Sequence, residues 1–506
     1  MKPFVATGLV GVACAAMIAC GGAEPSAQTS GGVGLRTPNS PLVTLRVMVK
    51  TGSIDDPAGL NGLNALTAMM IGQGGTTALS YQELTTALYP WAASISAHYD
   101  KEVTTIVGEV HRDHLEPFYA IFRDLIVQPR FDAGDFERNR DFLTNAIVTT
   151  LRGNDDEELG KQALNALLYA GHPYEATEMG TEQGLASITL DDVRAFHAAH
   201  YTRDNLLIGV AGGYTDGFLE RVETDLAAGL PAGDALRGDL PAPRALEGRE
   251  LLIVEKDAIA TAISLGFPID VTRADDDFYP LMVANSYFGE HRTFNGLLMN
   301  QMRGLRGLNY GDYAYIERFI QDGGSTFPAP NTPRRQQFFS IWIRPVPHHN
   351  AAFALRQAVR ELDRLVEDGL SEADFEVTRE YLVNYSTLYV QTSSRRLGYA
   401  LDSEFYGTDF FVDEIRNRLS TMTVGDVNAA VKRHLQAENL GIAVVTREGE
   451  AFRDALLSDE PPSVTYNTEV DEDILAEDER IKSYQLAINP DRVRVVPVEQ
   501  MFGEIS

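Results

Sequence analysis

The histidines are the first residues to weigh for chemistry, because imidazoles serve both as metal ligands and as general bases. Three pairs lie close together in the sequence: His111 with His114, His197 with His200, and His348 with His349. A spacing of three on a helix can bring two imidazoles together, but no pair has a Glu placed as a base. We interpret the first pair as part of an exposed strand-to-helix junction and the second as the end of an amphipathic helix. A metal site at any of them stays the alternative.

Other common catalytic chemistries have no candidate in this sequence. It contains neither a phosphate-binding P-loop nor a Gly-x-Ser-x-Gly nucleophile elbow. Its 2 cysteines both lie within the first 20 residues, which excludes a disulfide scaffold and a cysteine-based zinc site.

The composition is that of a folded chain with an acidic surface. The 506 residues are 44% hydrophobic and 23% charged, which suits several domains that each bury a core. The formal net charge is −29, and the sequence isoelectric point is about 4.7. Nucleic-acid binding needs clustered Lys and Arg, so we expect no nucleic-acid partner.

The first residues have the features of a targeting segment. A short basic start is followed by an apolar run from Phe4 to Ala19, which ends in Met17-Ile18-Ala19-Cys20. This ending resembles the lipobox of bacterial lipoproteins, in which the cysteine is lipidated and becomes the mature N-terminus. We therefore expect Cys20 to anchor the protein in the bacterial cell envelope, facing the periplasm. The outer membrane is favoured because no Asp follows Cys20. A plain secretory signal is the alternative.

Hydrophobic periodicity behind this segment predicts alternating strands and helices. In the first half we expect strands over 42–48, 93–99, 103–110 and 206–211, and helices over 58–71, 111–127 and 132–151. Ser80 and Thr189 each precede an acidic residue by three positions. This pattern is typical of a helix start, so we expect a further helix after each of them.

The same landmarks return roughly 235 to 240 residues later, as expected for an internal duplication. Three pairs of segments match in order: Asp135-Phe136-Glu137 with Asp374-Phe375-Glu376, Thr189-x-x-Asp192 with Thr423-x-x-Asp426, and His200-x-x-x-x-Asn205 with His434-x-x-x-x-Asn439. We predict an α+β protein of two homologous α/β domains in a clam-like arrangement, each a mainly antiparallel sheet packed with helices. The expected organisation is a signal peptide (1–19), a flexible tether (20–40), an N-terminal domain (41–243), a C-terminal domain (244–448) and an acidic C-terminal extension (449–506). An apolar segment near 493–498 is expected to dock back on the body.

Several short motifs occur in the order found in one peptidase family. They are Gly62-Leu63, Gln128-Pro129-Arg130-Phe131, His172-Pro173-Tyr174, and an Arg and a Tyr seven residues apart, Arg303 and Tyr310. Over roughly residues 42–500 the chain resembles the insulinase/pitrilysin family of zinc metallopeptidases, which includes the mitochondrial processing peptidase.

The catalytic motif of that family is missing. In H-x-x-E-H two His at i and i+4 hold zinc from one helix face, and the Glu takes a proton from the metal-bound water. Ala65, Ala68 and Met69 occupy these positions here, and Ala146 falls at about the position of the third ligand. These side chains offer the metal no oxygen or nitrogen. The resemblance therefore implies an abandoned zinc site, with no metal in this chain.

The resemblance assigns a role to Arg303 and Tyr310. In the family such a pair reaches across a closed chamber to the bound peptide, where N–H and O–H donors can stabilise a developing oxyanion. From periodicity alone, the alternative is a helix end with a surface Arg and a half-buried Tyr.

The resemblance implies a non-catalytic, peptide-binding subunit of a heterodimeric zinc peptidase. Zinc is expected in a homologous partner that carries H-x-x-E-H. Contact with the membrane is expected through the lipid alone. Two alternatives stay open, because fold does not determine function. One is a structural scaffold with a peptidase-like fold. The other is a hydrolase with atypical metal ligands.

Overall fold

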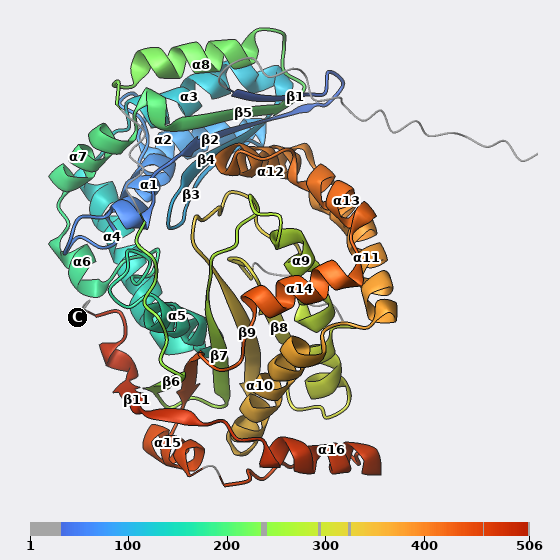
Figure 1. The fold of residues 1–506 in the computed structure, drawn as a ribbon. Helices are drawn as coiled ribbons and strands as arrows, with labels where there is room; N and C mark the ends of the chain where they lie inside the picture. The colour runs from blue at the N-terminus through green and yellow to red at the C-terminus, as the bar shows by residue number, and fades with distance from the viewer. Residues whose placement is uncertain (1–31, 234–239, 292–294, 322–324, 459, 504–506) are drawn as a thin grey trace, which may run out of the picture.

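The first half of the chain folds around a five-stranded sheet (Figure 1). The computed structural model describes residues 32–233, 240–291, 295–321, 325–458 and 460–503. In the first half the strands are β1 (Gly32–Arg36), β2 (Leu42–Val49), β3 (Ser94–Tyr99), β4 (Thr104–His111) and β5 (Leu206–Gly212). The helices are α1 (Leu63–Gln73), α2 (Tyr81–Leu88), α3 (Leu115–Val127), α4 (Ala133–Asn145), the π-helix η4 (Ala146–Asn154), α5 (Asp156–Leu168), α6 (Glu182–Ser187), α7 (Leu190–His200) and α8 (Phe218–Gly229).

The second half folds around a six-stranded sheet. Its strands are β6 (Arg249–Glu255), β7 (Thr261–Ile269), β8 (Asp312–Tyr315), β9 (Gln337–Val346), β10 (Gly441–Thr446) and β11 (Ile488–Pro497). Its helices are α9 (Phe278–Gly289), the π-helix η6 (Met299–Gly304), α10 (Ala351–Asp368), α11 (Glu372–Tyr385), α12 (Ser393–Tyr406), α13 (Phe411–Thr421), α14 (Val424–His434), α15 (Gly449–Leu457) and α16 (Glu472–Ser483).

The two sheets share one topology. The strand order is β1-β5-β2-β4-β3 in the first sheet and β6-β10-β7-β9-β8 in the second, with β11 added beside β6. In both sheets the first pair is parallel, and the remaining pairs of the shared order are antiparallel. The duplication and the mainly antiparallel sheets expected from the sequence are confirmed.

Matching capping boxes begin equivalent helices in the two halves. At α7 the Thr189 hydroxyl accepts a hydrogen bond from the backbone N–H of Asp192 (3.2 Å), and the Asp192 carboxylate accepts one from the N–H of Thr189 (2.8 Å). Thr423 and Asp426 make the same two bonds at α14. Each box satisfies N–H groups that a helix start leaves without partners, so the sequence landmarks mark equivalent positions in space.

Each half contributes a helix to the sheet of the other half. Helix α5 packs on β7 and β10, and α12 packs on β5, β2 and β1 (Figure 1). A glycine lies beneath each crossing: a Cβ on Gly441 would come within 2.6 Å of Leu168, and one on Gly209 within 2.8 Å of Leu397. The close approach of helix and strand therefore requires glycine at both positions.

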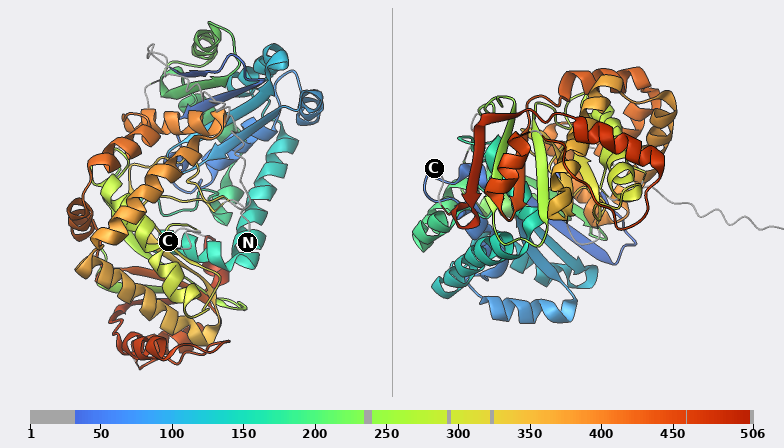
Figure 2. Two further views of the ribbon diagram at one scale, coloured as in Figure 1. Left: turned by 90° about the vertical axis from the view of Figure 1, so that its right-hand side faces the viewer. Right: turned by 90° about the horizontal axis from the view of Figure 1, so that it is seen from below.

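The C-terminal segment joins the two halves. Strand β11 runs parallel to β6, with Val493–Pro497 opposite Leu251–Glu255, so the docking expected near 493–498 is confirmed (Figure 2). The chain then reaches α6, where the N–H groups of Glu182 and Gln183 donate to the carbonyls of Phe502 and Gly503, both at 3.1 Å. We call residues 498–503 the C-terminal strap.

Some expectations need correction. Gly32–Arg36 lies in the expected flexible tether but forms β1, because its backbone pairs with β5 and Gly34 allows the Tyr214 hydroxyl to approach. The helix expected over 58–71 begins only at Leu63, since Gly62 has a φ of 105°. The helix expected over 132–151 is α-helical only to Asn145 and continues as η4.

Three large apolar clusters form the core. One lies within the second half and one within the first, and the third contains residues of both halves. We call this third cluster the interdomain core. Within the described ranges no helix is long and apolar enough to cross a membrane. Cys20 and the expected signal peptide lie outside the residues that the structure describes.

Candidate functional site

The positions of the lost zinc motif lie on a buried helix. On α1 the side chains of Ala65 and Ala68 are fully buried, and Met69 is 5% exposed. Ala65 and Met69 belong to the interdomain core, where they pack among apolar residues of α4, α5 and α7. The face that would present imidazoles to a metal is therefore part of the hydrophobic core.

A half-buried carboxylate fixes the start of α1. Asp56 accepts hydrogen bonds from the backbone N–H groups of Gly62 and Asn64, both at 2.7 Å. Burial raises the pKa of Asp56 to about 7, although these hydrogen bonds act in the opposite direction. The helix that carries the altered motif is thus held firmly in place.

The expected third ligand position lies at the start of a π-helix. Ala146 is half-buried and is the first residue of η4. π-Helical turns are rare and are often found at functional sites. The four positions Ala65, Ala68, Met69 and Ala146 hold no oxygen or nitrogen ligand, so these residues do not fit a zinc ion. Nor do the described residues contain any group of three His, Cys, Asp or Glu side chains that could hold a metal.

A cavity of about 340 Å³ opens beside the altered motif. Met69, Gly72 and Gln73 of α1 line one wall, and residues of α2 and β3 line the others. Strand β3 is the edge of the first sheet, and its residues alternate between exposed and half-buried. An edge strand can pair with an extended peptide through backbone hydrogen bonds.

The side chains of Arg303 and Tyr310 lie against each other. Arg303 is the next-to-last residue of η6, and its guanidinium carbon lies 4.8 Å from the centroid of the Tyr310 ring. The Tyr310 side chain is 63% exposed rather than half-buried. Among the described residues its hydroxyl has no hydrogen-bond partner, so it remains available as a donor.

Further charged residues surround this pair. The guanidinium carbon of Arg344, on β9, lies 5.1 Å from the Tyr310 ring centroid, and its Nε donates to Glu157 of α5 at 2.9 Å. Asp312 is fully buried nearby and accepts a hydrogen bond from Asn309 at 2.7 Å. Burial raises the pKa of Asp312 to about 8, which keeps this carboxyl largely protonated at neutral pH.

Sequence reasoning missed Arg344 and Glu157. They are distant from Tyr310 in the sequence, and their proximity depends on α5 of one half packing against the other half. One local signal was present: Arg344 interrupts the apolar strand Phe338–Ile343.

The histidine pairs have structural roles. The Nε2 atom of His197 lies 2.8 Å from the carbonyl of Ile126, and the His200 ring stacks on Phe196 at 4.1 Å, so both complete the end of α7. His111 and His114 are half-buried, with ring centroids 6.4 Å apart. His348 Nδ1 contacts the Thr261 hydroxyl at 2.8 Å.

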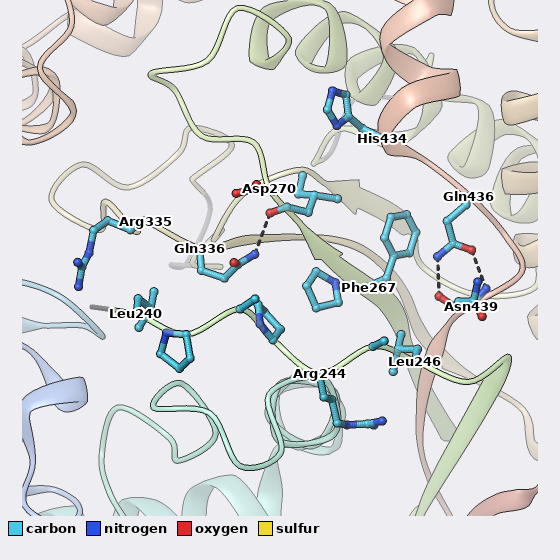
Figure 3. Close-up of a pocket in the computed structure, with 16 residues that line it drawn as sticks. Leu240, Arg244, Leu246, Phe267, Asp270, Arg335, Gln336, His434, Gln436 and Asn439 are labelled. Carbon is cyan, nitrogen blue, oxygen red and sulfur yellow. Dashed lines mark hydrogen bonds between the residues drawn. The ribbon is translucent and has the colours of Figure 1, made fainter. Parts of the chain in front are cut away.

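A cavity of about 900 Å³ lies between residues 240–246 and the end of β7 (Figure 3). Polar side chains on its wall already bond to neighbours: Arg244 to Glu250 (2.7 Å) and His434 to Asp277 (2.7 Å). Figure 3 shows a further bonded pair, Gln436 and Asn439. We therefore assign no chemistry to this cavity.

The fold and the altered motif together define a peptidase-like protein of two related domains without a set of zinc ligands. Comparison with known families agrees: the insulinase (peptidase family M16) profile matches residues 33–182, and the peptidase M16 inactive-domain profile matches residues 187–382. The chain belongs to the insulinase family, as its motifs indicated.

Relatives support the same assignment. An uncharacterized zinc protease of Mycobacterium tuberculosis is 26% identical, over 80% of this chain and 88% of that one. The non-peptidase homolog YmxG of Helicobacter pylori is 22% identical, over 78% of this chain and 87% of that one. The peptidase M16 inactive domain from Pseudomonas fluorescens shares the fold, with a TM-score of 0.73 and 20% identity over 84% of this chain and 98% of that one. These similarities fit a non-catalytic, peptidase-like protein.

Proposed function

We propose that this chain is the peptide-binding, non-catalytic subunit of a two-chain zinc peptidase. One observation carries the proposal: the motif positions Ala65, Ala68 and Met69 are apolar and buried, whereas the donors Arg303 and Tyr310 lie together with Tyr310 open to solvent. An exposed tyrosine hydroxyl whose ring is restrained by a neighbouring arginine is expected in a chain that still binds peptide.

In this proposal the chemistry is divided between two chains. A homologous partner with an intact H-x-x-E-H supplies zinc and the general base. This chain supplies donors that bind the peptide and stabilise negative charge on its carbonyl. The free edge of β3, with the cavity beside Met69, is a second place where an extended peptide can bind.

The test uses the purified chain alone. We expect it to contain no stoichiometric zinc, to cleave no labelled casein and yet to bind that casein in a fluorescence anisotropy titration. Arg303→Ala is expected to weaken the binding at least tenfold. About one tightly held zinc per chain would favour a hydrolase with atypical ligands. If the Arg303→Ala variant binds casein as tightly as the unmodified chain does, a structural scaffold is favoured.

We also propose that a lipid on Cys20 anchors the protein to the cell envelope, with the outer membrane favoured. The sequence Met17-Ile18-Ala19-Cys20 supports this proposal, together with the Gly- and Ser-rich stretch that follows. Cys20→Ser is expected to release the protein from the membrane fraction or to block its maturation. An intact mass showing an unlipidated start at another residue would contradict the proposal.

A further inference from the structure

The ring of Tyr310 lies close to two arginines. The guanidinium carbons of Arg303 and Arg344 are 4.8 Å and 5.1 Å from its ring centroid, both within the range of cation–π attraction. An exposed tyrosine with one such contact keeps much of its rotamer freedom. Two contacts restrict the ring and therefore the direction of its hydroxyl.

Arg344 is itself held at several points. Its backbone N–H donates to the carbonyl of Gly311 (3.2 Å), and its own carbonyl accepts from the side-chain amide of Asn309 (2.9 Å). Its Nε donates to a carboxylate oxygen of Glu157 (2.9 Å). The Glu157 side chain is 13% exposed, so this ion pair is partly shielded from water.

Glu157 belongs to the other half of the molecule. It lies in the first turn of α5, the helix that crosses from the first half onto the second sheet. Two further contacts hold this part of α5: Asp156 pairs with Lys256 of the second half at 2.6 Å, and the Lys161 ammonium lies 3.9 Å from the ring centroid of Trp342. The carboxylate that orients Arg344 is therefore fixed by the packing of the two halves, together with Lys161 of α5, whose ammonium lies 3.0 Å from the other carboxylate oxygen of Glu157.

We propose that Arg344 and Glu157 are positioning residues that fix the Tyr310 hydroxyl for binding peptide. Glu157 orients Arg344, and Arg344 together with Arg303 restricts the Tyr310 ring. The orientation of Tyr310, in the second half, therefore depends on helix α5 of the first half. This inference rests on the proposed function, because it assumes that Tyr310 contacts peptide.

The first experiment measures the ring rather than binding. The full chain is labelled with 3-fluorotyrosine, and the fluorine signal of Tyr310 is identified by its loss in Tyr310→Phe. Glu157→Gln, which keeps size and removes charge, and Arg344→Met are expected to shift this signal towards that of free fluorotyrosine. Glu158→Gln is the matched control, because Glu158 bonds within α5 to Gln162 at 2.9 Å. An unshifted signal in both variants overturns the inference.

The second experiment measures affinity for labelled casein. Glu157→Gln and Arg344→Met are expected to weaken binding about tenfold, while Arg344→Lys, which keeps a cation that can contact the ring, stays within about threefold of the unmodified chain. If Arg303→Ala and Tyr310→Phe weaken binding but both positioning variants bind normally, the positioning role is overturned and the proposed function survives. If Arg303→Ala and Tyr310→Phe also bind normally, the proposed function fails.

Discussion

At the scale of single residues, catalytic groups have been lost while packing has been kept. Ala65 and Ala68 are small enough to be fully buried, and Ala65 lies in the interdomain core together with the flexible apolar side chain of Met69. The sequence alone shows that these side chains offer a metal no oxygen or nitrogen, because residue types decide whether a metal can be bound. It could not predict that Arg344 and Glu157 flank Tyr310, because their contact depends on tertiary packing.

Restoring a single histidine tests how completely the site is filled. Ala65→His places a large polar ring where no space remains, so the free energy of unfolding is expected to fall by about 1–3 kcal/mol. Ala198→His is the control, because Ala198 is exposed on α7, and it should change stability by less than about 0.5 kcal/mol. Urea unfolding of both variants gives the comparison. Equal stability of Ala65→His and the unmodified chain would mean that the motif positions are not packed as described.

At the scale of elements, local sequence signals were reliable where a side chain caps a helix. Ser80, Thr189 and Thr423 all accept the expected hydrogen bonds at helix starts. Elements whose stability depends on distant partners were harder to predict. The strand β1 has the glycine-rich sequence of a linker and becomes a strand only through pairing with β5. The π-helices η4 and η6 have no recognised sequence signal.

The start of α1 should make stability depend on pH. The folded chain keeps a proton on Asp56 up to about pH 7, whereas the unfolded chain releases it near pH 4. Through this group the free energy of unfolding falls as the pH rises from about 4 to 7, and it is constant above that range.

Asp56→Asn removes this titration. The stability of the variant relative to the unmodified chain is therefore expected to increase by about 1.4 kcal/mol for each pH unit between about 4 and 7. Urea unfolding at pH 5, 6, 7 and 8, buffered at constant ionic strength, measures the difference. A difference that does not change with pH would show that Asp56 titrates as an ordinary surface carboxyl.

At the scale of the whole molecule, the two halves form one interlocked unit. Besides the crossing helices, a buried ion cluster links them: Arg334 pairs with Asp100 and with Glu178 (2.7 Å). Burial alone would raise the pKa of Glu178, but Lys101 and the neighbouring arginines hold it well below its usual range. The duplication was visible in the sequence, whereas the exchange of helices between the halves was not.

The C-terminal strap contributes to this interlocking. Phe502 is 7% exposed and packs in the interdomain core, so Phe502→Ala is expected to lower the free energy of unfolding by about 3 kcal/mol or more. Glu499 accepts its hydrogen bond from Arg152 through its backbone carbonyl (2.9 Å), which Glu499→Ala keeps, so this variant is a matched control with little effect. Denaturant unfolding measures the stability of both variants. If Phe502→Ala is as stable as Glu499→Ala, the C-terminal strap is a loosely attached end that does not stabilise the molecule.

We propose that this chain provides substrate-side donors to a zinc site on another chain. The most direct test is steady-state cleavage of an internally quenched peptide by the complex of this chain with a homologous chain that carries H-x-x-E-H. Tyr310→Phe removes only the hydroxyl donor, and it is expected to lower kcat by roughly 10²–10³-fold without changing the affinity between the chains. Full turnover by both Tyr310→Phe and Arg303→Ala would contradict the account.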